Sequence, residues 1–166
     1  LKVVPSSPIE NILDEQKRNL IPFYDFYAAA GSFSEMQENK DFEMIEAPLQ
    51  YTADKKHFCC KVVGESMNRR IENNSICVFK EPLGGSRNGK IVLVENFGKN
   101  DEEYNSSFTI KTYASEKRVT DDGEWEHSVI LLKPNSTESR FEDIVLHEDD
   151  CENMRIVGEF VTVLEE

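Results

Sequence analysis

The sequence predicts a mostly β domain, and three observations carry that prediction. Short apolar stretches recur about every dozen residues from position 57 onward, which is typical of consecutive strands. Turn-forming residues stand between them, as in Asn88-Gly89 and Asp121-Asp122-Gly123. Stretches with helical periodicity are brief. The length of 166 residues suits one domain with a buried core.

The expected strands can be given in chain order. An aromatic stretch at 21–27 comes first, with Phe23 and Tyr27 spaced to share one face, and small residues at 28–32 end it. The polar stretch 96–107 predicts a loop. After residue 50, the apolar stretches predict strands at 57–63, 75–80, 90–95, 108–113, 128–132 and 156–164.

Charge and hydropathy exclude several classes of partner. Acidic residues outnumber basic ones 32 to 19, for a net charge of −13. Binding to nucleic acid through phosphates needs clustered Lys and Arg, and an anionic membrane surface attracts the same residues. Apolar runs are far shorter than the ~20 residues of a membrane span, and residues 1–8 do not resemble a signal peptide. We therefore expect a cytoplasmic protein that contacts neither membrane nor DNA through this segment.

The cysteines and histidines do not form a metal-binding pattern. No two cysteines have the two-residue gap of a zinc or redox motif, and the three histidines are scattered. We expect no metal and no other cofactor. The four cysteines are predicted to be reduced, mostly buried thiols: Cys59, Cys60, Cys77 and Cys151.

One motif, Gly64-Glu65-Ser66-Met67, directly follows an apolar stretch. A serine in a turn after a strand, beside a glycine that lets another backbone approach, is one way to present a nucleophile. The alternative is that Ser66 is the N-cap of a short helix.

A nucleophilic serine needs a base, and no histidine lies at a strand end that would supply one. A buried lysine can serve instead, because burial lowers the pKa of a lysine and favours its neutral amine. Lys111 lies in the apolar stretch 108–113, where strand alternation places Thr109, Lys111 and Tyr113 on one face. The alternative is that Lys111 points to solvent.

These residues together resemble the S24 peptidases, the self-cleaving repressor family that includes LexA, the phage cI-type repressors and the UmuD mutagenesis proteins. The resemblance extends over residues 21–166 and implies a LexA/signal-peptidase-like compact β domain with short helical turns. It rests on the stretches 62–67, 75–79, 88–94, 109–111, 132–135 and 156–158, in that order.

The resemblance implies a role for each matching residue. Ser66 would be the nucleophile and Lys111 the general base, with the backbone N–H groups of Glu65 and Ser66 as the oxyanion hole. Family members cut themselves at an Ala-Gly or Cys-Gly bond ahead of the catalytic domain. Here Ala30-Gly31 lies 36 residues before Ser66, a separation similar to that of the family, so Ala30 and Gly31 form the expected cleavage site.

The resemblance also divides the chain, and several positions depart from the family pattern. Residues 1–20 would be a linker or the remnant of an upstream domain, 21–50 the cleavage-site segment, and 51–166 the peptidase and dimerisation domain. Asn68-Arg69 stands where the family often has proline, and Asn74-Ser75 replaces Gly-Asp. Because asparagine tolerates positive φ, we expect the turn at Asn74 to survive.

The implied function is that of an autoproteolytic transcriptional regulator. Its trigger would be a RecA filament in the DNA-damage (SOS) response, and repressor-like DNA contact would belong to a missing upstream domain. The alternative is a non-cleaving dimerisation or docking module of a larger protein, such as a repressor or a helicase fusion. A homodimer is expected through 156–164, where the alternation predicts a partly wet face that includes Glu159. A protease acting in trans is disfavoured, because a signal-peptidase relative would need a membrane anchor.

Overall fold

The computed structural model describes residues 3–4, 19–24, 42–53, 56–96 and 108–165. Within these ranges, no helix is long and apolar enough to cross a membrane. The expected cleavage site, Ala30-Gly31, and most of the polar stretch 96–107 lie outside the described residues.

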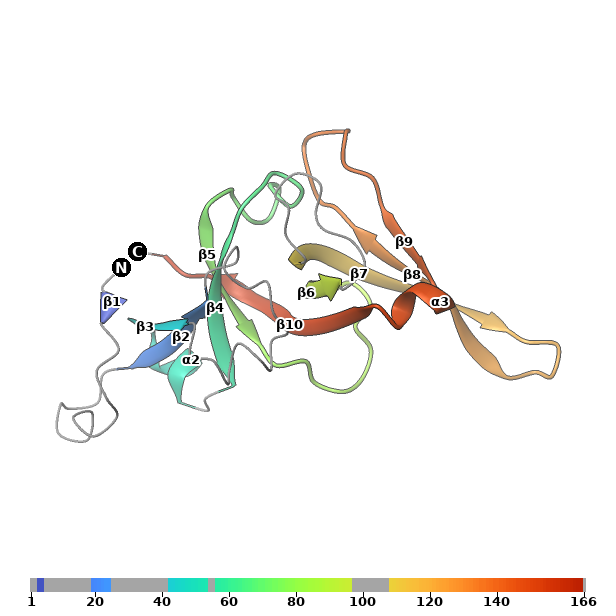
Figure 1. The fold of residues 1–166 in the computed structure, drawn as a ribbon, viewed down its shortest axis with the longest axis horizontal. Coiled ribbons are helices and arrows are strands. Elements are labelled where there is room, and N and C mark those ends of the chain that lie inside the picture. The colour runs from blue at the N-terminus through green and yellow to red at the C-terminus, as the bar shows by residue number, and fades with distance from the viewer. Residues whose placement is uncertain (1–2, 5–18, 25–41, 54–55, 97–107, 166) are drawn as a thin grey trace.

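The described residues form one ten-stranded mixed sheet with two helices of one turn each (Figure 1). The elements are β1 (Val3–Val4), β2 (Leu20–Tyr24), β3 (Phe42–Glu46), α2 (Leu49–Thr52), β4 (His57–Val62), β5 (Ser75–Lys80), β6 (Ile91–Asn96), β7 (Phe108–Val119), β8 (Trp125–Lys133), β9 (Ile144–His147), α3 (Glu148–Cys151) and β10 (Met154–Val163). The strand order is β1-β3-β2-β4-β5-β10-β6-β7-β8-β9, and among these described strands only β2 and β4 pair in parallel.

Strand β10 lies between two halves of the sheet, one made of β1–β5 and the other of β6–β9. Its residues Met154–Glu159 pair with β6, and Glu159–Val163 pair with β5 on its other edge. As a result β5 and β6, which follow each other in sequence, lie on opposite sides of the last strand, as Figure 1 shows.

Apolar side chains from both halves meet at this junction, where Leu93 of β6 and Ile110 of β7 share a core cluster with residues of β4 and β5. Phe58 of β4 and Phe79 of β5 stack with ring centroids 5.7 Å apart. Gly158 of β10 lies against them so closely that a Cβ there would be 2.8 Å from Phe58 Cζ. The absence of a side chain at Gly158 therefore lets β10 approach the two rings.

The mostly β prediction is confirmed, as are the six strands expected after residue 50, with shifted ends. The strands that the sequence did not predict are β1, β3 and β9, and β7 and β8 extend into a longer hairpin. The prediction of a partly solvent-exposed face at Glu159 is wrong. Its side chain is 2% exposed, and Lys90 Nζ lies 3.3 Å from its carboxylate. The positive charge of Lys90 compensates the buried carboxylate of Glu159.

Candidate active site

Ser66 lies in a series of turns after β4, which we call the Ser66 loop (residues 64–71). Gly64 has φ 113° and Asn74 has φ 69°, so the loop begins and ends near residues in conformations that favour glycine or asparagine. Gly64 N–H donates to Asn73 Oδ1 at 2.9 Å, and Asn74 N–H donates to Val62 O at 2.8 Å. The survival of the turn at Asn74 is thus confirmed.

The far end of the Ser66 loop is anchored in the core. Met67 and Ile71 are 2% and 0% exposed, and Ile71 N–H donates to Met67 O at 2.8 Å. Residues 66–70 form turns and no helix, so the interpretation of Ser66 as a helix N-cap is wrong. Ser66 itself is half-buried at the surface of this anchored loop.

Lys111 approaches Ser66 from β7, in the other half of the sheet. Its side chain is 6% exposed, so the alternative in which it points to solvent is also wrong. Lys111 Nζ lies 2.9 Å from Ser66 Oγ, within hydrogen-bond distance. The structure therefore brings together two residues that are 45 positions apart in the chain.

Two further acceptors surround the lysine amine. Lys111 Nζ donates to Thr109 Oγ1 at 2.9 Å and to Ile110 O at 3.1 Å. A neutral amine has two N–H donors and one lone pair. With these two acceptors satisfied, its lone pair can receive the hydroxyl proton of Ser66. This geometry suits an amine that accepts a proton from Ser66.

The sequence did not assign a function to Thr109. Strand alternation places it on the face of Lys111, and that spacing is the signal that could have identified it.

The backbone around Ser66 leaves two N–H groups available. In the part of the chain that the structure describes, the N–H groups of Glu65 and Ser66 donate to no acceptor. By contrast, Asn135 N–H donates to Ser66 O at 2.8 Å, which ties the Ser66 loop to the loop after β8. Free N–H groups beside a hydroxyl are what an oxyanion hole requires.

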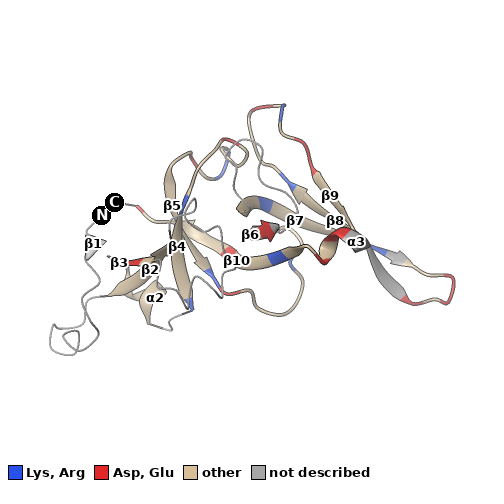
Figure 2. Ribbon diagram, viewed as in Figure 1, with Lys and Arg blue, Asp and Glu red and all other residues tan. Residues whose placement is uncertain are grey.

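Metal-ligating and charged side chains are dispersed over the described part of the chain (Figure 2). Among the described residues, no group of three or more His, Cys, Asp or Glu could hold a metal ion. Figure 2 shows acidic and basic residues interspersed over both halves of the ribbon.

The thiols are buried in the sheet, away from this chemistry. Cys59, Cys60 and Cys77 are at most 2% exposed, and burial raises the pKa of Cys59 and of Cys77 to about 12. Burial raises the pKa of Cys60 as well, and its neighbour Cys77 adds to that effect. Since thiols with raised pKa are poor nucleophiles, they are structural groups here.

The fold is that of a LexA-like domain of a serine peptidase family. The sequence matches the Peptidase S24-like family over residues 22–161, and the chain belongs to that family. Among curated proteins, no match to the chain was found.

Proposed function

We propose that this domain cleaves its own chain at Ala30-Gly31, with Ser66 as nucleophile and Lys111 as general base. The observation that carries the proposal is the 2.9 Å contact between Nζ of Lys111, a residue that is almost completely buried, and Ser66 Oγ. A buried lysine is more readily neutral than an exposed one, and only the neutral amine can accept a proton.

The first half of the reaction transfers the peptide to the enzyme. Lys111 Nζ takes the hydroxyl proton as Ser66 Oγ attacks the carbonyl carbon of Ala30. The N–H groups of Glu65 and Ser66 stabilise the negative oxygen that forms. The C–N bond then breaks, and the amine of Gly31 leaves with the proton from Lys111. An ester between Ser66 and Ala30 remains.

The second half restores the site. Lys111, neutral again, takes a proton from a water molecule as that water attacks the ester carbonyl. The bond between the carbonyl carbon and Ser66 Oγ breaks, and Ser66 regains its proton from Lys111. The products are residues 1–30 with a new carboxylate and residues 31–166 with a new amine.

The test is incubation of the purified chain at increasing pH, followed by intact-mass analysis. Raising the pH deprotonates lysine and so activates the base without a partner protein. We expect scission between Ala30 and Gly31, absent from Ser66→Ala and Lys111→Ala. Lys117→Ala is the matched control, because Lys117 is an exposed lysine on the same strand. A chain that stays intact at every pH at which it is folded would contradict self-cleavage and favour the docking-module alternative.

The proposed trigger is a RecA filament on single-stranded DNA, and its support is the resemblance to the self-cleaving repressors. At neutral pH, addition of such a filament should accelerate cleavage of the wild-type chain and leave Ser66→Ala intact. An equal rate with and without filament would remove this trigger from the proposal.

A homodimer is the second part of the proposal. Residues 160–163 pair with β5 on one edge, and none of the described strands pairs with them on the other. Such an edge can accept a strand from a second copy. Light scattering after size-exclusion chromatography should give twice the mass of one chain, and the monomer mass at every concentration would contradict a dimer.

A further inference from the structure

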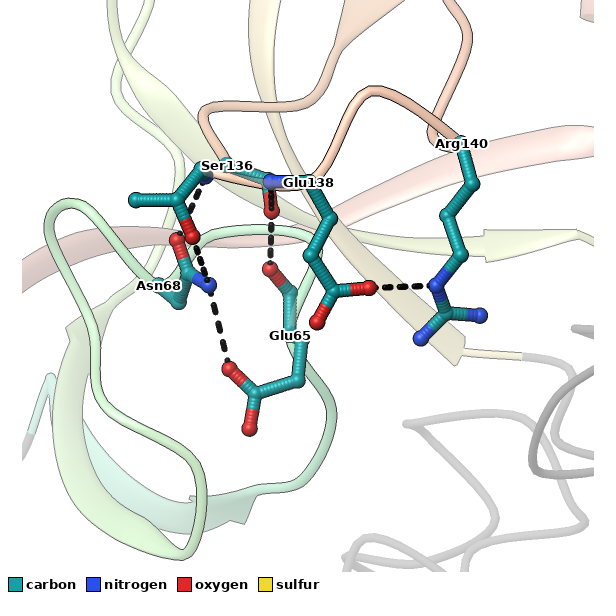
Figure 3. Close-up of polar contacts among 6 residues, drawn as sticks. Glu65, Asn68, Ser136, Glu138 and Arg140 are labelled. Carbon is teal, nitrogen blue, oxygen red and sulfur yellow. Dashed lines mark hydrogen bonds and ion pairs between the residues drawn. The ribbon is translucent and has the colours of Figure 1, made fainter.

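The Ser66 loop is fastened to a second loop by a side chain that the proposed chemistry does not use. Ser136 lies in the 134–140 loop, which follows β8. Its hydroxyl donates to the backbone oxygen of Glu65 at 2.7 Å and accepts from Glu138 N–H at 3.1 Å (Figure 3). The hydroxyl of Ser136 is thus itself held in place by its own loop.

A second side chain crosses between the same loops. Asn68 Nδ2 donates to Thr137 Oγ1 at 2.9 Å and to Glu65 Oε2 at 3.1 Å. Asn68 Oδ1 accepts from Thr137 N–H at 2.8 Å. These bonds hold the two loops in register, so that Ser136 stays beside Glu65.

The atom that Ser136 binds matters because of peptide geometry. The carbonyl of Glu65 and the N–H of Ser66 belong to one planar peptide unit, in which they point in opposite directions. Whatever fixes the direction of Glu65 C=O therefore fixes the direction of Ser66 N–H. On the other side of Ser66, the bond from Asn135 N–H to Ser66 O holds the next peptide unit.

We propose that Ser136 is a positioning residue, whose hydroxyl orients the Glu65–Ser66 peptide unit and thereby aims Ser66 N–H at the developing oxyanion. This inference rests on the proposed function and adds a residue to it. Ser136 does not touch the reacting atoms. Its removal lets the peptide unit rotate, which misdirects one donor of the oxyanion hole.

The test compares three substitutions in the full chain by their rate of alkaline self-cleavage. Ser136→Ala should lower the maximal rate by roughly tenfold, since misplacement of a catalytic group commonly has effects of this order or larger. The pH at half-maximal rate should not move, because the bond between Lys111 and Ser66 is untouched. Ser136→Thr keeps the hydroxyl and should retain the rate. Ser86→Ala, an exposed loop serine, is the matched control.

Two outcomes of the rate measurement would overturn the proposal. One is a wild-type rate in Ser136→Ala. The other is an equal loss of rate in Ser136→Thr with an equal fall in Tm, which would show a general loosening of the loops.

A second measurement does not depend on cleavage. The 15N order parameter of the Ser66 N–H should fall in Ser136→Ala and stay at the wild-type value in Ser136→Thr and Ser86→Ala. An unchanged order parameter in Ser136→Ala overturns the proposal even if cleavage is slow. A reduced order parameter in a chain whose wild type does not cleave supports the orienting role and refutes the proposed function instead.

Discussion

Thr109 and Lys111 lie two residues apart on β7, and their side chains meet at 2.9 Å between Thr109 Oγ1 and Lys111 Nζ. Because the two residues share a face of the strand, the hydroxyl can hold the amine in line with Ser66. The site is therefore a group of three side chains, two of them from one strand.

Replacing Thr109 should change self-cleavage in two measurable ways. Thr109→Val removes an acceptor that favours the ammonium form, so the pH at half-maximal rate should decrease. The maximal rate should also fall, by roughly tenfold, because the amine loses a group that positions it. Thr109→Ser should restore both values, and an unchanged pH profile in Thr109→Val would contradict this role.

The buried thiols predict a loss of stability at high pH. The folded pKa values of Cys59 and Cys77, about 12, exceed the ordinary value of 9.0 because burial disfavours the thiolate. A raised folded pKa means stability that is fully present below pH ~9 and lost progressively as the pH rises toward about 12. Urea unfolding at pH 8, 9, 10 and 10.5 should therefore show a decreasing free energy of unfolding.

A matched pair of variants tests this explanation. Each thiol contributes at most about 1.4 kcal/mol per pH unit, so Cys59→Ala should reduce the pH dependence, although it also lowers stability at pH 8. Cys151→Ala, at a partly exposed cysteine, should leave the pH dependence as in the wild type. An identical pH dependence in both variants would contradict the assignment to Cys59.

The same burial predicts selective thiol labelling. At pH 8 in the folded protein, a thiol reagent such as DTNB should react rapidly with Cys151, whose thiol is partly exposed, and slowly with the three buried cysteines. After unfolding, all four should react. Rapid reaction of two or more thiols in the folded chain would show that β4 and β5 open readily.

Gly158 predicts a steric effect at the junction of the two halves. In Gly158→Ala the new Cβ would lie 2.8 Å from Phe58 Cζ and 3.1 Å from Phe79 Cβ. We expect the free energy of unfolding to fall by roughly 1–3 kcal/mol, as for other overpacked cores. Chemical denaturation measures this change.

The control for that substitution is Gly84→Ala, since a Cβ there meets no atom within 4 Å. Its effect should stay within ~0.5 kcal/mol. In the double variant Gly158→Ala with Phe58→Leu, the smaller side chain should relieve part of the strain, so the combined loss should be less than the sum. If the two losses of unfolding free energy simply add, the contact with Phe58 is not the source of the strain.

Sequence patterns predicted those strands whose side chains are buried in a regular way. β5 and β6 have continuous apolar runs, and β4 lies between turn signals. β9 has the opposite character, because Ile144 and Val145 are 38% and 48% exposed. Its extended conformation comes from pairing with β8, and β3 depends in the same way on β2. A short strand that forms by pairing with a distant strand need not show an alternation of apolar and polar residues.

The same distinction holds within the site. Ser66 could be found because its motif directly follows a strand, and Lys111 because it lies within an apolar strand. Ser136 and Asn68 could not, because their partners lie 71 and 69 positions away in the sequence, and loop residues have no alternation to follow. Their role depends on how two loops meet, which only the folded sheet determines.

The position of β10 has a consequence for the order of events during synthesis. Ser66 follows β4 in one half of the sheet, Lys111 is on β7 in the other, and β10, which is synthesised after both, inserts between β5 and β6. The N-terminal parts of a chain fold first as it emerges, yet the strand pairing that links β5 to β6 needs residues 154–163. A nascent chain thus contains Ser66 and Lys111 before the strand pairing around them is complete. The complete sheet that supports the proposed site can form only after β10 has been synthesised.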